Sequence, residues 1–284
     1  MTVRLKRIYC VLLISLIKVT TISAHAISDT TKLIAGITKK PVTVTEDKSD
    51  IVAANVEYPE SLQEQKEQSL EYVENFSNKK RNYLISIYEK GKEYFPKVEE
   101  VLKSFQLPVE LKVLMALESG FNGNAVSRVG AVGYWQIMDA VAKEYGLHIV
   151  SRKHKQSGKL KKKDDRKNFT KSTLAAAKYL RDRCLDLNND LLLMVASYNC
   201  GVGRVWNAIK KCGKTDAGFW DIKNFLPAET RNYVMNFIAL NVIFGNYENF
   251  TKKQLVFYPA LIKNTEENNA IYNNTLPPGT VNLD

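Results

Sequence analysis

Apolar side chains recur at helical spacing over most of the chain, and the strict alternation typical of strands is scarce. The pattern therefore predicts a mainly α protein. Its helices are expected near residues 62–76, 79–90, 95–105, 137–145, 172–187, 190–199, 203–211 and 227–244, with a further helix beginning after Pro108. Residues 147–164 are compatible with short strands, because no helical period is resolved there.

Both ends of the chain lack a sustained period. Residues 27–69 are expected to form an N-terminal arm or linker, and residues 247–284 a C-terminal tail. We expect one domain between them, over residues 70–246. No internal repeat is apparent.

Residues 1–26 have the features of a secretory signal peptide. Three basic residues precede an apolar stretch over residues 8–17, and Ala24-His25-Ala26 supplies a small-x-small cleavage site. We expect the mature protein to begin at Ile27 and to be exported to the periplasm or cell envelope. No uninterrupted apolar run reaches the ~20 residues that a membrane-spanning helix needs, so none is expected in the mature chain.

Basic residues are concentrated in one segment. The formal net charge is +11, and it falls to +7 without residues 1–26, while residues 152–167 alone carry +7. This segment lacks the interleaved aromatic residues of a nucleic-acid groove, so we expect no nucleic-acid partner. A solvated loop and a contact with an anionic cell-envelope polymer both remain open for residues 152–167.

Glu118 lies on the apolar stripe of the helix predicted after Pro108. Leu111, Leu114, Met115 and Glu118 follow the i, i+3, i+4, i+7 spacing. Desolvation and the negative end of the helix dipole both raise the pKa of a carboxyl group there. A carboxylic acid that keeps its proton near neutral pH can act as a general acid. A buried Glu paired with a basic residue is the alternative that the periodicity also allows.

Residues 130–138 combine two glycines, spaced three apart, with Tyr134, Trp135 and Gln136. Aromatic faces beside an amide suit a sugar, although a packing loop is equally compatible with this pattern. Farther on, residues 191–203 begin as a helix that is apolar all round, which indicates a buried central helix.

Polar groups close two of the predicted helices. Tyr198 and Asn199 end the apolar helix just before a glycine, which places them at the mouth of the core. Tyr233 shares an apolar stripe with Phe237, so its hydroxyl is expected to point inward and to need a partner. The three histidines give no convincing metal set, and no Ser or Cys nucleophile with a base is evident. We predict neither a metal nor a cofactor.

Six short phrases, taken in this order, resemble the catalytic domain of the lytic transglycosylases of the soluble-lytic-transglycosylase type. They are ESGFN at 118–122, AVSRVGA at 125–131, GYWQ at 133–136, YGL at 145–147, ASYN at 196–199 and ETRNY at 229–233. The likeness extends from about residue 70 to residue 246.

The resemblance implies a lysozyme-like, mainly α fold with a cleft for the glycan strands of peptidoglycan. Family members cleave the β-1,4 bond between N-acetylmuramic acid and N-acetylglucosamine without water. Glu118 would be the single acid/base, and the muramyl 6-hydroxyl would close onto C1 as a 1,6-anhydro ring, which dispenses with a second carboxylate. The resemblance also implies that Ser127 makes a hydrogen bond near Glu118 and that Gln136 contacts the sugar. Tyr198 and Asn199 would line the cleft, and Tyr233 would orient the acid.

The chain departs from the family just after Met138. Asp139 and Val141 stand where the family usually has Pro and Thr, and Cys200 stands where a small residue is usual. Asp139 places a carboxylate near the expected cleft, so a hydrolytic muramidase on the same fold remains an alternative. A non-catalytic peptidoglycan-binding protein is the other alternative. Glu118 argues against it, because an unpaired buried acid costs stability and needs a reason.

Overall fold

The structure, a computed structural model, describes residues 53–153 and 160–258, with the backbone alone at 151–153 and 160–162. The predicted signal peptide at 1–26, and most of the predicted arm and tail, lie outside the described residues. Within the described part, no helix is long and apolar enough to cross a membrane.

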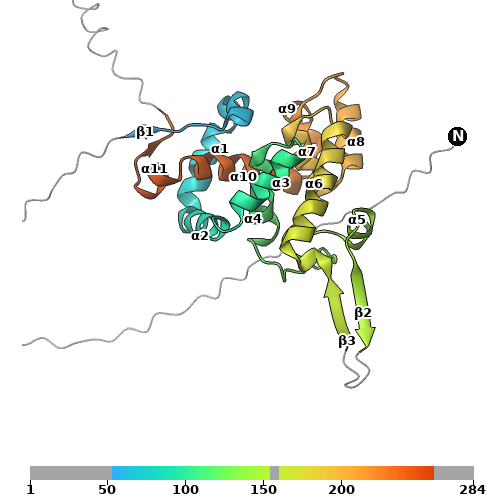
Figure 1. Cartoon of the computed structure of the whole chain (residues 1–284). Coiled ribbons are helices and arrows are strands. Elements are labelled where there is room, and N and C mark those ends of the chain that lie inside the picture. Colours follow the sequence, from blue (N-terminus) through green and yellow to red (C-terminus); the bar gives the residue numbers. More distant parts are fainter. Residues whose placement is uncertain (1–52, 154–159, 259–284) are drawn as a thin grey trace, which may run out of the picture.

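Helices make up most of the described chain, which confirms the predicted mainly α class (Figure 1). The α-helices are α1 Lys66–Lys79, α2 Arg81–Gly91, α3 Phe95–Ser104, α4 Leu114–Ser119, α5 Asp139–Glu144, α6 Phe169–Asp186, α7 Leu191–Cys200, α8 Val202–Cys212, α9 Phe219–Ile222, α10 Ala228–Gly245 and α11 Tyr247–Thr251. Short 3-10 helices are η1 Glu60–Gln65, η2 Val109–Val113, η3 Asp165–Lys167 and η4 Lys223–Phe225. The strands are β1 Ala54–Asn55, β2 Ile149–Lys153, β3 Leu160–Asp164 and β4 Leu255–Val256.

Two helices, α7 and α10, form the centre of the core. Both are apolar on nearly every side, and eight of the ten residues of α7 are buried. Helix α1 packs on α10, α10 packs on α7, and α6 and α8 cover other sides of α7. Tyr198 lies in the last turn of α7 and Tyr233 in the second turn of α10. The core therefore holds both tyrosines on rigid elements.

The sequence sets both ends of α7. At its start, the side chain of Asp190 accepts a hydrogen bond from the backbone N–H of Leu193 at 2.8 Å, as a good N-cap does. At its end, Gly201 has a φ of 85°, a conformation that favours glycine. Because the helix is stopped there, Tyr198 and Asn199 stand at the border of the core.

The ordered fold extends beyond the predicted domain at both ends. Strand β1 pairs in parallel with β4, with Ala54 opposite Leu255, and Leu62 in η1 is fully buried (0% exposed). The predicted boundaries at residues 70 and 246 are therefore too narrow. Two-residue strands are too brief to produce a readable period, which is why the sequence pattern missed β1 and β4, whereas η1 overlaps the helix expected near residues 62–76.

Strands β2 and β3 form an antiparallel hairpin that projects from the helices (Figure 1), with Ile149 opposite Asp164 and Lys153 opposite Leu160. This confirms the short strands expected within residues 147–164. Residues 152–153 and 160–164 of the basic segment 152–167 belong to these strands. Most of the segment falls outside the residues whose side chains are described.

Candidate active site

Glu118 lies in the last turn of α4. Instead of one continuous helix after Pro108, the chain forms η2 and then α4, which ends at Gly120 in the left-handed conformation, with a φ of 57°. Such a stop is a common way to end a helix. It leaves Glu118 close to the exposed carbonyls of the helix end, where a negative charge is unfavourable.

The carboxyl group of Glu118 opens into a pocket and is otherwise enclosed by protein. Burial raises its pKa to about 7, because the charged form loses the solvation that water would give it. A hydrogen bond from Tyr233 opposes this shift, and the negative charge of Glu229 adds to it. The raised pKa agrees with the expectation from the apolar stripe, and Glu118 therefore exchanges its proton near neutral pH.

Tyr233 is the hydrogen-bond partner of Glu118. Its hydroxyl donates to Oε1 of Glu118 at 2.6 Å, from α10 to α4. The pKa of Tyr233 is raised well above its usual value by burial and by the nearby carboxyl group. Tyr233 thus stays protonated and remains a donor, which fixes the orientation of one carboxyl oxygen. The inward hydroxyl predicted from the helical stripe is found.

One wall of the pocket belongs to the loop that precedes α5. Gln136 has a φ of 47°, and its amide nitrogen donates to the carbonyl oxygens of Gly133 at 2.8 Å and Ala125 at 3.3 Å. These bonds hold Gln136 within the pocket lining, beside Glu118. The Oγ of Ser127 accepts a hydrogen bond from the backbone N–H of Ala131 at 3.0 Å, which closes the loop. The hydrogen bond of Ser127 near Glu118 stays a prediction.

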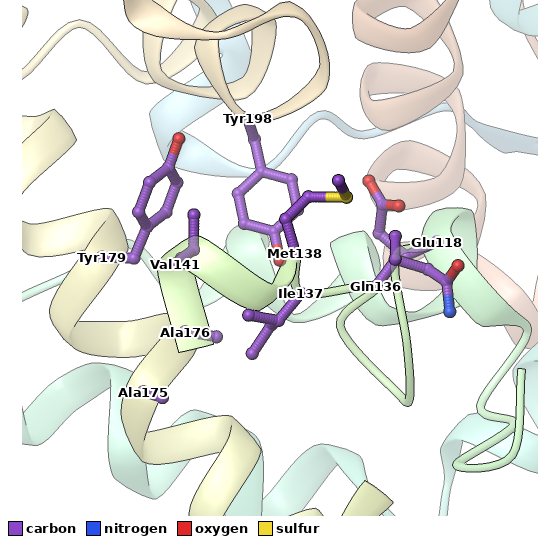
Figure 2. A pocket seen from close by; sticks show the side chains of 10 residues that line it. Glu118, Gln136, Ile137, Met138, Val141, Ala175, Ala176, Tyr179 and Tyr198 are labelled. Carbon is purple, nitrogen blue, oxygen red and sulfur yellow. The ribbon is translucent and has the colours of Figure 1, made fainter. Parts of the chain in front are cut away.

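The opposite end of the pocket is aromatic. Figure 2 shows Glu118 at one end and the ring of Tyr179 at the other, with Met138 and Tyr198 between them. The hydroxyl of Tyr198 donates to the carbonyl oxygen of Trp135 at 2.7 Å, and the rings of Tyr179 and Tyr198 meet nearly edge to face, 5.6 Å apart. Aromatic and apolar walls with a few polar groups are typical of a ligand site.

Two residues of this region face the core instead of the pocket. For Trp135, the sequence leaves both a sugar contact and a packing loop open; its side chain is 1% exposed and its indole N–H donates to Thr173 at 3.1 Å, which agrees with the packing loop. Asn199, expected to line the cleft, is buried and is not among the residues that line the pocket. Its Oδ1 accepts a hydrogen bond from Thr230 at 2.8 Å, which ties α7 to α10. The helical period predicts that a residue lies on a helix. It does not predict whether a residue at the end of that helix faces the cleft or the core.

Two residues of the site were missed from the sequence. Tyr179 lies on α6, and its single aromatic ring among alanines gave no signal. Glu229 lies one helical turn before Tyr233 on α10, and its own pKa is raised by burial. The phrase ETRNY contains it, so that signal was present. Asp139, by contrast, forms an exposed ion pair with Lys143 at 2.6 Å and does not line the pocket.

Across the described residues, no three or more His, Cys, Asp or Glu side chains are grouped so as to hold a metal ion.

Comparison with known proteins shows which domain family part of the chain resembles. Residues 99–219 match the model of the transglycosylase SLT domain, a stretch that contains Glu118, Gln136 and Tyr198. Membrane-bound lytic murein transglycosylase D of Escherichia coli strain K12 is 32% identical to this chain over 187 residues, which is 65% of this chain and 38% of the relative. The chain thus spans well under half the length of that relative.

Other similar proteins match smaller shares of this chain. A putative tributyltin chloride resistance protein of Alteromonas sp. strain M-1 is 34% identical over 112 residues, which is 39% of this chain and 49% of that protein. An inactive variant of the lytic transglycosylase Slt from Pseudomonas aeruginosa has a TM-score of 0.42 and 23% identity, and covers 55% of this chain and 24% of its own. The 70 kDa soluble lytic transglycosylase of Escherichia coli has a TM-score of 0.41 and 21% identity, over 52% and 24% of the two chains.

Proposed function

We propose that this protein is a peptidoglycan lytic transglycosylase with Glu118 as its acid/base. One observation carries the proposal: within an SLT domain, Glu118 has a pKa of about 7, receives a hydrogen bond from Tyr233, and lines a pocket with an aromatic wall. A group that titrates near neutral pH is suited to give and to take a proton in one turnover.

The reaction then proceeds in two proton transfers. Protonated Glu118 donates its proton to the glycosidic oxygen as the bond from C1 of N-acetylmuramic acid to O4 of N-acetylglucosamine breaks. The carboxylate of Glu118 next accepts the proton of the muramyl 6-hydroxyl, whose oxygen forms a bond to C1. The products are a free 4-hydroxyl and a 1,6-anhydromuramyl end, and Glu118 is again protonated. No water is consumed.

The neighbouring residues have distinct roles in this proposal. Tyr233 keeps the carboxyl group of Glu118 in place through its 2.6 Å hydrogen bond to Oε1. Gln136 and Tyr198, together with Tyr179, contact the sugar. Ser127 acts on the substrate through the loop that it closes, and Asn199 fixes the end of α7 against α10.

We further propose that the protein acts outside the cytoplasm, in the periplasm or cell envelope. The signal-peptide features of residues 1–26 support export. The murein transglycosylase among its relatives supports peptidoglycan as the substrate. Contact between residues 152–167 and an anionic envelope polymer stays a prediction.

A hydrolytic muramidase is the second candidate, and Glu229 favours it. The negative charge of Glu229 influences Glu118, so a second carboxylate lies near the acid. Many glycosidases use such a pair, with one carboxylate activating water. The muramidase would release a reducing N-acetylmuramic acid end instead of the anhydro ring.

Digestion of purified sacculi, followed by mass spectrometry of the released muropeptides, tests the proposal. We expect products lighter by one water than hydrolysed ones, and no products from Glu118→Gln. Hydrated products that disappear in Glu118→Gln would support the muramidase. If neither protein releases fragments but both bind sacculi, the protein is a non-catalytic binding protein and both enzymatic proposals fail.

A further inference from the structure

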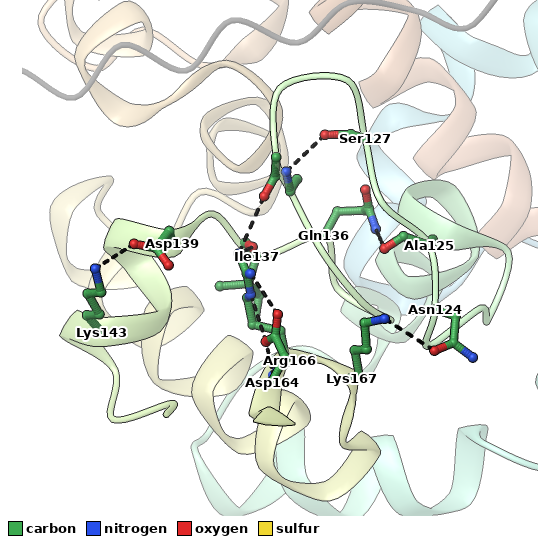
Figure 3. A network of polar contacts seen from close by, with 12 residues as sticks. Asn124, Ala125, Ser127, Gln136, Ile137, Asp139, Lys143, Asp164, Arg166 and Lys167 are labelled. Atoms are coloured by element: carbon green, nitrogen blue, oxygen red, sulfur yellow. Dashed lines mark hydrogen bonds and ion pairs between the residues drawn. The ribbon is translucent and has the colours of Figure 1, made fainter. Parts of the chain in front are cut away.

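The side chain of Arg166 joins the base of the β2–β3 hairpin to the pocket wall. Arg166 is 7% exposed. Its Nε and Nη2 donate to the two carboxylate oxygens of Asp164, at 2.9 and 2.7 Å. Its Nη1 donates to the carbonyl oxygen of Ile137 at 3.2 Å and lies 3.4 Å from that of Gly130 (Figure 3). One buried guanidinium thus reaches both ends of the segment 130–137.

The backbone of Arg166 also touches this segment. Gly133 packs so closely that a Cβ at position 133 would lie 2.0 Å from the carbonyl oxygen of Arg166. Real Cβ atoms do not approach a backbone oxygen at that distance, so only glycine fits without movement of one backbone or the other. Gly130 has the same φ of 87°, but a Cβ there would meet nothing within 4 Å.

The segment held by Arg166 carries one side of the pocket. Ala131, Gln136 and Ile137 belong to it, and all three line the pocket with Glu118. Its middle is held from the other direction. Ser119 donates to the carbonyl oxygen of Tyr134 at 2.7 Å, and Tyr198 donates to the next carbonyl along the chain.

The two sets of contacts have different consequences. The hydrogen bonds of Ser119 and Tyr198 come from α4 and α7, which border Glu118. The hydrogen bonds of Arg166 come from η3. Neither Glu118 nor Tyr233 has a described contact with Arg166. A change at Arg166 therefore moves the wall without directly moving the acid or its hydrogen-bond partner.

We propose that Arg166 is a positioning residue for glycan binding: it fixes segment 130–137 as the wall against which the sugar lies. The inference rests on the proposed function, because it assigns the wall to the glycan substrate. Lysine cannot replace it, since one ammonium group does not reach the Asp164 carboxylate and two backbone carbonyls in fixed geometry. Loss of the clamp weakens substrate binding while the proton chemistry is kept.

The test compares wild type with Arg166→Lys, Gly133→Ala and Gly213→Ala. Turnover of soluble, uncross-linked peptidoglycan strands gives kcat and KM, and binding of the same strands is measured in a Glu118→Gln background. Gly213→Ala is the matched control, because Gly213 has a φ of 74° at the end of α8, outside the segment 130–137, and a Cβ there would meet nothing within 4 Å. Thermal unfolding reports the fraction of each variant that is folded.

We expect Arg166→Lys and Gly133→Ala each to raise KM and to weaken binding by about ten-fold, since a small misplacement of a binding group has effects of this size or larger. We expect kcat to change much less than KM, the pH dependence of kcat to stay that of wild type, and Gly213→Ala to bind strands like wild type.

Three results would overturn the proposal. The first is a lower kcat at unchanged KM, which indicates a smaller folded fraction and a purely structural Arg166. The second is equal loss in Gly213→Ala and Gly133→Ala, which assigns the effect to backbone strain. The third is a wild type that neither binds nor cleaves strands, which removes the function as well. A wild type that binds but does not cleave overturns the proposed function alone, and the clamp is then judged from the binding data.

Discussion

Removal of the Tyr233 hydroxyl should shift the pH dependence of the reaction upward. In Tyr233→Phe, Oε1 of Glu118 loses the 2.6 Å hydrogen bond that lowers its pKa. A hydrogen bond to a charged group contributes about 1.5–3 kcal/mol, and one pKa unit corresponds to about 1.4 kcal/mol. Because the pocket is open to water, we take the lower end, which is a rise of about one unit above the wild-type value.

A general acid works only while it holds its proton, so activity is lost as the pH rises through the pKa of Glu118. Initial rates of muropeptide release should therefore fall near pH 7 in wild type and about one unit higher in Tyr233→Phe. The maximal rate of the variant should be lower by about ten-fold, because the acid is no longer held in orientation.

Tyr198→Phe is the matched control. It removes a hydroxyl from the same pocket, and that hydroxyl donates to the Trp135 carbonyl, so the alkaline limb should stay at the wild-type pH. If Tyr233→Phe leaves the alkaline limb unchanged, or moves it to lower pH, the hydrogen bond does not govern the acid and the reasoning is refuted.

Four further predictions concern charge and stability. Glu229→Gln should move the alkaline limb to lower pH, since the negative charge that raises the pKa of Glu118 is gone; an unmoved limb in the same rate assay would contradict this. Glu118→Gln should stabilise the fold at pH 8 by up to about 3 kcal/mol in urea unfolding, because wild type must ionise an enclosed carboxyl group. That gain in stability should shrink as the pH falls from 7 to 4.5 and vanish below 4.5, where Glu118 is protonated in both the folded and the unfolded protein. A gain independent of pH would contradict the link between the raised pKa and stability. Asn199→Ala should destabilise the fold by about 1–3 kcal/mol, because it leaves the buried Thr230 hydroxyl unpaired. KM should stay unchanged, and a raised KM would indicate that Asn199 contacts the substrate. Leu62→Ala should cost about 2–5 kcal/mol, and a loss near zero would mean that η1 is not part of the folded domain.

Sequence reasoning worked best where one physical effect dominates. The apolar stripe that ends at Glu118 predicted that this side chain is enclosed and that its pKa is raised. The direction was predictable because burial is the largest cause of the shift. The stripe of α10 placed the Tyr233 hydroxyl inside the protein. Tyr233 lies in a helix of 18 residues, whose period is long enough to be read, whereas the stripe that ends at Glu118 runs through η2 and the six-residue α4.

It failed where the outcome depends on tertiary contacts. Trp135 and Asn199 are buried, and their hydrogen-bond partners, Thr173 and Thr230, lie 38 and 31 positions away in sequence. No local pattern records such pairs. The bond of Ser127 is local instead, since a short hydroxyl side chain readily bonds a nearby backbone N–H. The aromatic wall at Tyr179 likewise exists only because α6 packs against α7.

The central claim is that Glu118 cleaves the glycan without water, and digestion of sacculi in water enriched in oxygen-18 tests it most directly. The account predicts 1,6-anhydromuramyl products that carry no oxygen-18, and no products from Glu118→Gln. Muropeptides with one oxygen-18 at the muramyl C1 would contradict it, and would show that water, not the 6-hydroxyl, attacks the sugar.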